Sequence, residues 1–150
     1  MSTALTIPAN FGYVALVASS GIVLYTALGF AVVAARKKYN VPYPDMGSGI
    51  YASKLDEKDW VAFNSVMRSH LNLSEQLPGY LILLLLSGLH YPRAAAIAGA
   101  TYTLGRFVYA RGYRSQGPQG RMGGAMLSMA SMVTLLGMTI WGSVTSLGLL

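Results

Sequence analysis

Residues 63–89 read FNSVMRSHLNLSEQLPGYLILLLLSGL, a polar stretch that continues without a break into a strongly apolar one. The second half is apolar enough to enter a lipid bilayer, whereas the first half carries Arg68, His70 and Glu75. A charged side chain near the middle of a membrane costs at least ~2.5 kcal/mol, so such residues usually face a bundle interior or a watery cavity. The stretch therefore predicts a membrane helix with a functional polar face.

The composition of the whole chain is that of a membrane protein. Of its 150 residues, 53% are hydrophobic and only 11% are charged, whereas soluble domains carry about 25% charged residues. The net charge of +6 could indicate a nucleic-acid partner, but residues 1–35 and 122–150 contain no acid or base. The charge is therefore confined to loops and a site in the middle of the chain, and we expect no nucleic-acid binding.

Cysteine is absent from the sequence. This excludes disulfides, thiolate metal sites and a cysteine nucleophile, so any thiol chemistry needs a thiol from a ligand. The two histidines, His70 and His90, are too far apart to form a metal pair, and no metal site is expected.

Four segments approach or exceed the roughly 20 residues that a helix needs to cross a bilayer. The predicted helices cover about residues 11–37, 58–89, 92–114 and 121–149. No internal repeat or second domain interrupts them, so the sequence predicts one domain over residues 1–150, an all-α integral membrane four-helix bundle. Basic residues gather in the first and third connections, which should face the cytoplasm with both termini on the opposite side.

Two predicted helices carry polar faces near the same end. On the second helix the face consists of Asn64, Arg68, Asn72 and Glu75. On the third helix it consists of Tyr102, Arg106, Tyr109 and Tyr113. At ~100° per residue each set falls within an arc of about 80° or less. The alternative to a binding site is a structural role, in which Arg68 forms an ion pair with Glu75, or Arg68 and Arg106 extend to the membrane surface and anchor the helices there.

The chemistry of the combined set favours one kind of ligand. Its charge is mainly positive, which implies an anion. Arginine suits carboxylates, glutamate suits an ammonium group, and the amides and hydroxyls suit a peptide backbone. Glutathione has this combination of groups.

The pattern FNSVMRSHLNLSEQLP resembles the motif F-N-x-x-x-R-x-H-x-N-x-x-E-x-x-P of the MAPEG family, the membrane-associated proteins in eicosanoid and glutathione metabolism. The stretches GRFVYARGY and ARKKYNVPYP are similar to the type 3 microsomal glutathione transferases, which are close to the leukotriene-forming synthases. The resemblance covers nearly the whole chain. It implies a homotrimer in an internal membrane, the endoplasmic reticulum, with the site between protomers.

The resemblance also implies roles for individual residues. The implied glutathione-binding set is Arg36, Lys37, Arg68, His70, Asn72, Glu75, Arg106, Tyr109 and Tyr113, with Arg36 contributed by a neighbouring subunit. Arg121 is similar to the arginine that stabilises the thiolate. The preceding loop is one residue longer than in the leukotriene-forming branch, which leaves Arg114 as the alternative. That branch has a second arginine where this chain has Lys37, so an acid role at this position stays open.

The leading interpretation is a membrane glutathione transferase with glutathione as its co-substrate. A thiol has a pKa near 8.5 and reacts as the thiolate, which a nearby arginine favours without any general base. The second substrate would be a lipophilic electrophile that enters from membrane lipid. Lipid hydroperoxide reduction or leukotriene-synthase-like activity would use the same site.

Two alternatives remain open. The first is a non-enzymatic member of the same fold that presents lipids to a partner enzyme, although such a protein would not need the full polar set. The second is an ion channel or transporter that uses Arg68 and Glu75 as a pathway.

Overall fold

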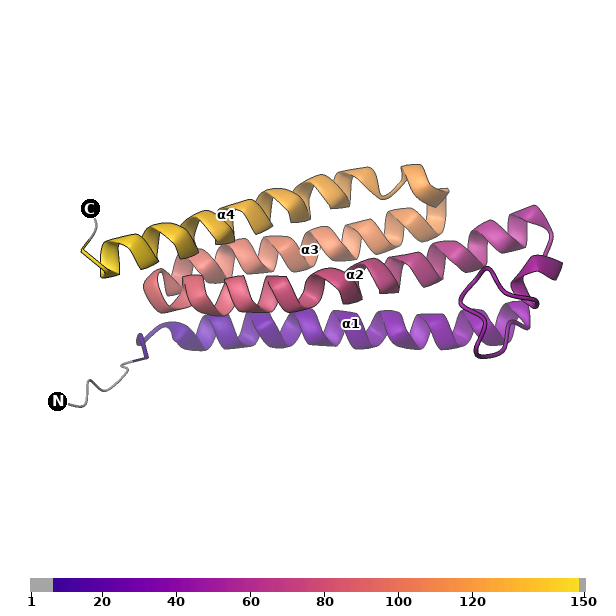
Figure 1. Ribbon diagram of the computed structural model, residues 1–150, viewed down its shortest axis with the longest axis horizontal. Coiled ribbons are helices and arrows are strands. Elements are labelled where there is room, and N and C mark those ends of the chain that lie inside the picture. The colour runs from indigo at the N-terminus through magenta and orange to yellow at the C-terminus, as the bar shows by residue number, and fades with distance from the viewer. Residues whose placement is uncertain (1–6, 149–150) are drawn as a thin grey trace.

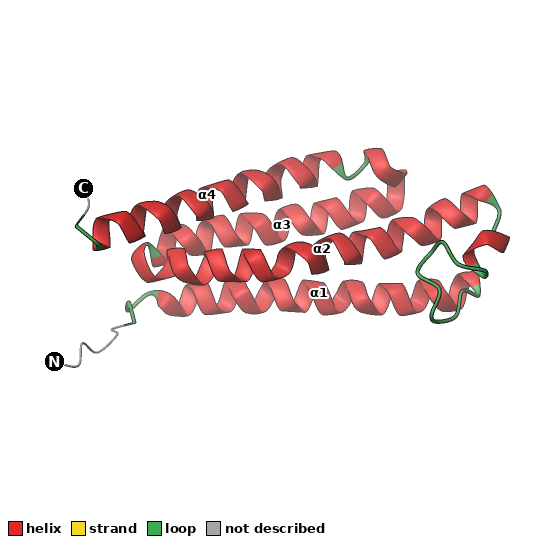
Figure 2. Cartoon of the chain, in the orientation of Figure 1, coloured by secondary structure: helices red, strands yellow, loops and turns green. Residues whose placement is uncertain are grey.

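A computed structural model describes residues 7–148, and within these residues the chain is helical, with one longer loop between the first two helices and short connections elsewhere (Figures 1 and 2). The helices are α1 (Phe11–Tyr39), α2 (Glu57–His90), α3 (Pro92–Gln116) and α4 (Met122–Ser146), with two single 3-10 turns, η1 (Ala52–Lys54) and η2 (Gly117–Gln119). This confirms the predicted all-α four-helix bundle. The observed helix ends lie within three residues of the predicted ones, although residue 149 is outside the described range.

The four helices lie side by side along the long axis of the molecule (Figure 1). Helix α3 contacts each of the other three helices, and α4 packs on α2 and α3. The loop of residues 40–56 and η2 lie at one end, which we name the basic end because α1 ends there with Arg36, Lys37 and Lys38. The start of α1 and the end of α4 lie at the opposite end; the chain termini themselves are outside the described residues.

Two of the described helices, α1 and α4, are long and apolar enough to cross a membrane by composition alone. Their apolar stretches are largely unburied, with only 17% and 22% of those residues inside the bundle. Helices α2 and α3 do not meet this criterion, because the charged residues of the polar faces interrupt their apolar runs. Of the four predicted membrane spans, α1 and α4 are therefore apolar enough to cross a membrane, and α2 and α3 carry the polar faces of the predicted site.

Close contact between α3 and the start of α4 sets the geometry of the basic end. A Cβ atom added at Gly124 would overlap the backbone nitrogen of Tyr109, and one added at Gly112 would overlap the carbonyl oxygen of Gly120. Only glycine allows backbones to approach this closely. As a result Arg121, the residue before α4, lies beside the tyrosines of α3.

The loop of residues 40–56 folds around the carboxylate of Asp45. Its Oδ1 accepts hydrogen bonds from the backbone N–H groups of Gly47 (2.8 Å) and Gly49 (2.9 Å), and its Oδ2 accepts from those of Tyr51 (2.9 Å) and Ala52 (2.8 Å). These bonds, foremost the one from Ala52, lower the pKa of Asp45 from 3.8 to about 2 because they stabilise the ionised form. One side chain thus organises the whole connection.

A second contact fixes this loop to α2. The amide Nδ2 of Asn64 donates to the carbonyl oxygen of Gly47 at 2.9 Å. Gly47 has a φ of 104°, a conformation that favours glycine. The loop therefore lies against α2 one turn before Arg68.

Candidate functional site

A polar cavity of about 280 Å³ lies between α2, α3 and the first turns of α4. Four predicted site residues, from α2, α3 and the residue that precedes α4, line it: Asn72, Arg106, Tyr109 and Arg121. The remaining lining residues are Gln76, Met122, Ala125, Ser128 and Met129. The cavity therefore combines two guanidinium groups and two amides with a methionine-containing wall.

A short hydrogen bond joins the two polar faces that the sequence predicts. The Nδ2 of Asn72 on α2 donates to the hydroxyl oxygen of Tyr109 on α3 at 2.6 Å. Tyr109 is only 5% exposed, and the guanidinium carbon of Arg106 lies 4.3 Å from the centre of its ring. The tyrosine is thus held by an amide at one end and a cation over its face.

Arg106 is the most unusual group in the cavity, because it is a buried cation with little compensation. Its side chain is 3% exposed, and its Nη1 donates one long hydrogen bond, 3.4 Å, to Oε1 of Gln76. The same oxygen accepts from the hydroxyl of Tyr102 at 3.5 Å. The Nε and Nη2 of Arg106 have no hydrogen-bond partner among the described residues. A buried charge without a partner is strongly destabilising, so the cavity is suited to an anionic group.

Gln76 belongs to this cavity, although the sequence analysis did not select it. It follows Asn72 by four residues, so both lie on one side of α2. This spacing is the signal that could have identified it.

Arg121 and Arg114, the two candidates for thiolate stabilisation, lie on different sides of α3. Arg121 is partly buried, lines the cavity with Tyr109, and its guanidinium carbon lies 5.3 Å from the ring centre of Tyr113. Arg114 is exposed and lines a separate cavity together with Leu28 of α1.

A second polar cavity of about 270 Å³ lies next to the first, between the loop of residues 40–56, α2 and η2. It contains the predicted residues Arg68 and Tyr113 and also Asn64. The rings of Tyr113 and Tyr109 lie 5.7 Å apart, so the two cavities adjoin at this tyrosine pair. Together they divide the predicted site between a part with the buried Arg106 and a part with the exposed Arg68.

The remaining predicted residues line neither cavity within one chain. Arg36 is buried and turned toward its own loop, where its Nη1 donates to the carbonyl of Val41 at 3.2 Å. His70 stacks on Tyr25 of α1 with ring centres 4.8 Å apart, and its buried Nδ1 has no partner in the described part of the chain.

Two further charged residues, Lys37 and Glu75, are exposed. Neither residue lines the two polar cavities. Among residues 7–148, no group of three or more metal-ligating side chains is found.

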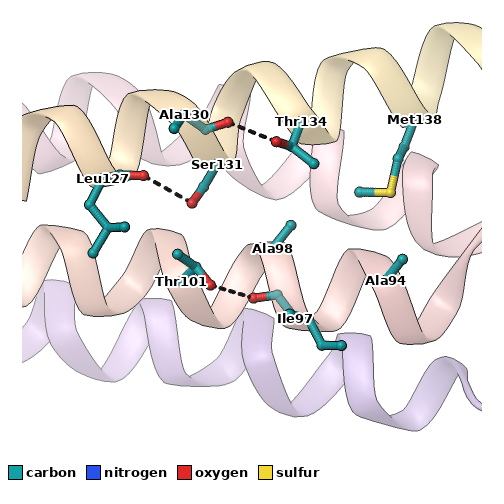
Figure 3. Close-up of a pocket in the computed structure, with 9 residues that line it drawn as sticks. All are labelled: Ala94, Ile97, Ala98, Thr101, Leu127, Ala130, Ser131, Thr134 and Met138. Carbon is teal, nitrogen blue, oxygen red and sulfur yellow. Dashed lines mark hydrogen bonds between the residues drawn. The ribbon is translucent and has the colours of Figure 1, made fainter.

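An apolar groove of about 370 Å³ runs between α3 and α4 on the outer surface (Figure 3). Its lining residues are Ala94, Ile97, Ala98, Thr101, Leu127, Ala130, Ser131, Thr134 and Met138. The hydroxyls of Thr101, Ser131 and Thr134 donate to carbonyls of their own helices, at 2.9 to 3.0 Å, so they add little free polarity. On α4 the groove begins at Leu127, beside the Ser128 that lines the polar cavity.

A comparison with known families matches residues 14–141 to the MAPEG family. The chain belongs to the MAPEG family. The match includes every residue that lines the two polar cavities. This MAPEG chain is also 34% identical, over 124 residues, to an uncharacterized protein, sll1147, of Synechocystis sp., with 82% of each chain covered.

Membership in MAPEG, together with the apolar helices, makes the protein an integral membrane protein, and the family acts in glutathione-related and eicosanoid metabolism. The family includes glutathione transferases and related enzymes and generally binds glutathione and lipophilic substrates in a membrane. The cavity with Arg106 and Arg121 is where this MAPEG chain gathers charged and amide groups suited to such a ligand.

Proposed function

We propose that this MAPEG protein is a membrane glutathione transferase that ionises the glutathione thiol in the cavity between α2, α3 and α4. One observation carries the proposal: Arg106 lines a cavity together with a second arginine, and two nitrogens of its buried guanidinium have no hydrogen-bond partner among the described residues. A carboxylate can accept two parallel hydrogen bonds from a guanidinium. Glutathione has two carboxylates and would supply the missing anion.

The two adjoining cavities suit an extended peptide ligand. One carboxylate would bind Arg106 in the first cavity, and the other would bind Arg68 in the second. The bonded pair of Asn72 and Tyr109 lies between them and offers groups for the peptide backbone. Glu75 would receive the ammonium group once a second subunit covers the outer face of α2.

The chemistry that follows is thiolate formation without a protein base. The guanidinium of Arg121 remains protonated at neutral pH, and a positive charge near the sulfur lowers the thiol pKa. The proton leaves to solvent, and the thiolate forms a carbon–sulfur bond with an electrophilic carbon. The group it displaces departs with the bonding electron pair; in an epoxide the opened oxygen stays on the product and takes a proton from water. Reduction of a lipid hydroperoxide would start from the same thiolate. The sulfur would attack the terminal peroxide oxygen, the O–O bond would break, and the lipid alkoxide would leave and take a proton from water. A second glutathione would then convert the sulfenic acid to glutathione disulfide and water.

The lipophilic substrate would approach along the apolar groove of Figure 3. The groove opens to the outer surface and begins on α4 next to the polar cavity, so an acyl chain in it would place its reactive end near the thiolate. The aliphatic lining does not select one substrate.

The further details of the proposal rest on sequence. The ARKKYNVPYP stretch supports the type 3 branch and a location in the endoplasmic reticulum. The basic residues of the first and third connections support a cytoplasmic position for the basic end. A homotrimer would bring the exposed Lys37 and Glu75 of one protomer toward the cavities of the next, whereas Arg36 and His70 would first have to leave their contacts with Val41 and Tyr25.

The test is a titration of the protein in zwitterionic nanodiscs with glutathione, followed by difference absorbance near 240 nm and by calorimetry. A saturable thiolate signal is expected. Arg106→Gln should weaken glutathione binding strongly, whereas Lys54→Gln, an exposed charge change in η1, should not. Calorimetry that detects no glutathione binding would overturn the proposal and favour the lipid-presenting alternative.

A further inference from the structure

A third cavity lies on the opposite side of α3 from the proposed glutathione site. It has a volume of about 650 Å³ and lies between α1 and the last turns of α3. Its lining residues are Leu28, Phe107, Ala110, Arg111, Arg114, Ser115 and Gln116. Arg111 lies about 160° around the helix from Tyr109, which places the two cavities on different faces. The proposed function uses none of these lining residues.

The charged residues of α3 show at which level of the membrane this cavity lies. Arg93 and Arg111 are 18 residues apart, which corresponds to about 27 Å along a helix. Outward-facing side chains between them are apolar, with Ile97 71% exposed and Leu104 56% exposed. The hydrocarbon core of a bilayer is about 30 Å thick. With Arg93 at one boundary of this core, Arg111 lies at the other boundary and Arg114 about 4.5 Å beyond it.

The cavity is therefore amphipathic in the direction of the membrane normal. Phe107 and Leu28 lie on the hydrocarbon side of the boundary, while Arg111 and Arg114 lie on the headgroup side. Both arginines are exposed, and their spacing of three residues places them as neighbours on one helix face. The lining within the described residues contains no carboxylate. Two neighbouring cations without an acidic partner repel each other unless an anion lies between them.

We propose that this cavity binds an anionic phospholipid of the surrounding bilayer. The headgroup phosphate lies between Arg111 and Arg114, because each guanidinium can donate two parallel hydrogen bonds to phosphate oxygens. An acyl chain lies along Phe107 and Leu28. The occupant is a bilayer lipid rather than the electrophilic substrate, because a molecule held on this face of α3 is separated by the helix from Arg121.

The test uses the full chain in nanodiscs of phosphatidylcholine alone and of phosphatidylcholine with phosphatidylglycerol. Retained lipid is counted by native mass spectrometry, and the thermal unfolding midpoint is measured in both compositions. The wild-type protein should retain phosphatidylglycerol and unfold at a higher temperature in its presence. The variant Arg111→Gln/Arg114→Gln should lose affinity for phosphatidylglycerol on the order of 30-fold, as expected for two basic groups at a membrane surface.

The matched control is Lys54→Gln/Lys58→Gln, which removes the same charge from exposed positions at the same end of the bundle. It should retain the lipid. Equal losses in both double variants would show general surface electrostatics and overturn the proposal. If the Gln variant does not fold, Arg111→Lys/Arg114→Lys keeps the charge and should show an intermediate affinity; unchanged retention would contradict paired phosphate binding.

Two further outcomes would also overturn the proposal. Equal stabilisation by inorganic phosphate in phosphatidylcholine discs would identify a site for soluble anions. No selective lipid uptake by the wild-type protein would show that another part of the assembly covers the cavity. Glutathione titration of the same samples separates these failures from a failure of the transferase proposal, since the two sites share no residue.

Discussion

Replacement of Arg121 by alanine tests the proposed chemistry most directly. A cavity of 280 Å³ is about 8 Å across if it is roughly spherical, so a sulfur near its centre would lie ~5 Å from the Arg121 guanidinium. At an effective dielectric constant of ~20, one charge at this distance contributes ~3 kcal/mol, or ~2 pKa units. A thiol pKa of ~8.5 would then fall to ~6.5. At pH 7 the thiolate fraction would be about three quarters with Arg121 and a few per cent without it.

Arg121→Ala should therefore reduce the thiolate absorbance and the rate of conjugation at pH 7 by about 25-fold, with recovery as the pH approaches 9. Glutathione affinity at pH 7, measured by calorimetry, should fall only about fourfold, which is what the loss of thiolate stabilisation contributes at this pH, because Arg106, Asn72 and Arg68 still hold the peptide. Arg121→Lys should be intermediate, since it keeps the charge but not the planar fork. A full thiolate signal in Arg121→Ala together with its loss in Arg114→Ala would refute the assignment.

Three other predictions concern binding, substrate entry and the loop. Tyr109→Phe removes the 2.6 Å hydrogen bond from Asn72. Calorimetry should show that glutathione binding is weaker by ~0.5–1.5 kcal/mol. A loss of several orders of magnitude in the conjugation rate would instead assign thiol activation to the tyrosine. Ala130→Trp should fill the α3–α4 groove and raise the KM for a lipophilic electrophile while leaving the glutathione Kd unchanged. Equal increases in this KM and in the glutathione Kd would exclude the groove as the substrate path. Because the folded pKa of Asp45 is lowered to about 2 from 3.8, its stabilisation of the loop is complete above pH ~4 and is lost as the pH falls through 2. Asp45→Asn should therefore speed hydrogen exchange of the loop amides at pH 7, and unchanged protection would contradict the role of the carboxylate.

The polar face of α3 could be predicted from sequence because its residues are large and follow the helical repeat closely. Tyr102, Arg106, Tyr109 and Tyr113 are all buried, with exposures between 1% and 7%. The face of α2 was less certain because its predicted arc is wide. Asn72 points inward, whereas Glu75 is exposed. Glu75 precedes the buried Leu77 by two residues, or ~200° around the helix, so the core on one side of α2 turns Glu75 outward.

The loop around Asp45 could not be predicted, for a different physical reason. Local side-chain bonds of aspartate typically reach the backbone two residues ahead. Here the carboxylate also accepts bonds from residues four, six and seven positions ahead. That arrangement depends on the positive φ of Gly47 and on the contact of Asn64 with the same residue. The spacing of residues in the sequence reveals neither this backbone conformation nor this tertiary contact.

The exposure of Glu75 predicts that one chain is not the complete functional unit. Glu75 lies 15 residues before His90, or about 22 Å from that end of α2. With His90 at one boundary of a hydrocarbon core ~30 Å thick, Glu75 lies ~8 Å inside the other boundary. A carboxylate facing lipid at that depth is unfavourable, so we expect a neighbouring subunit to cover this face. Light scattering in mild detergent should give the mass of three chains, and Glu75→Leu should leave that mass unchanged while it weakens glutathione binding. An active, monodisperse monomer would show instead that Glu75 is accommodated by water or lipid headgroups and that the cavities of a single chain suffice.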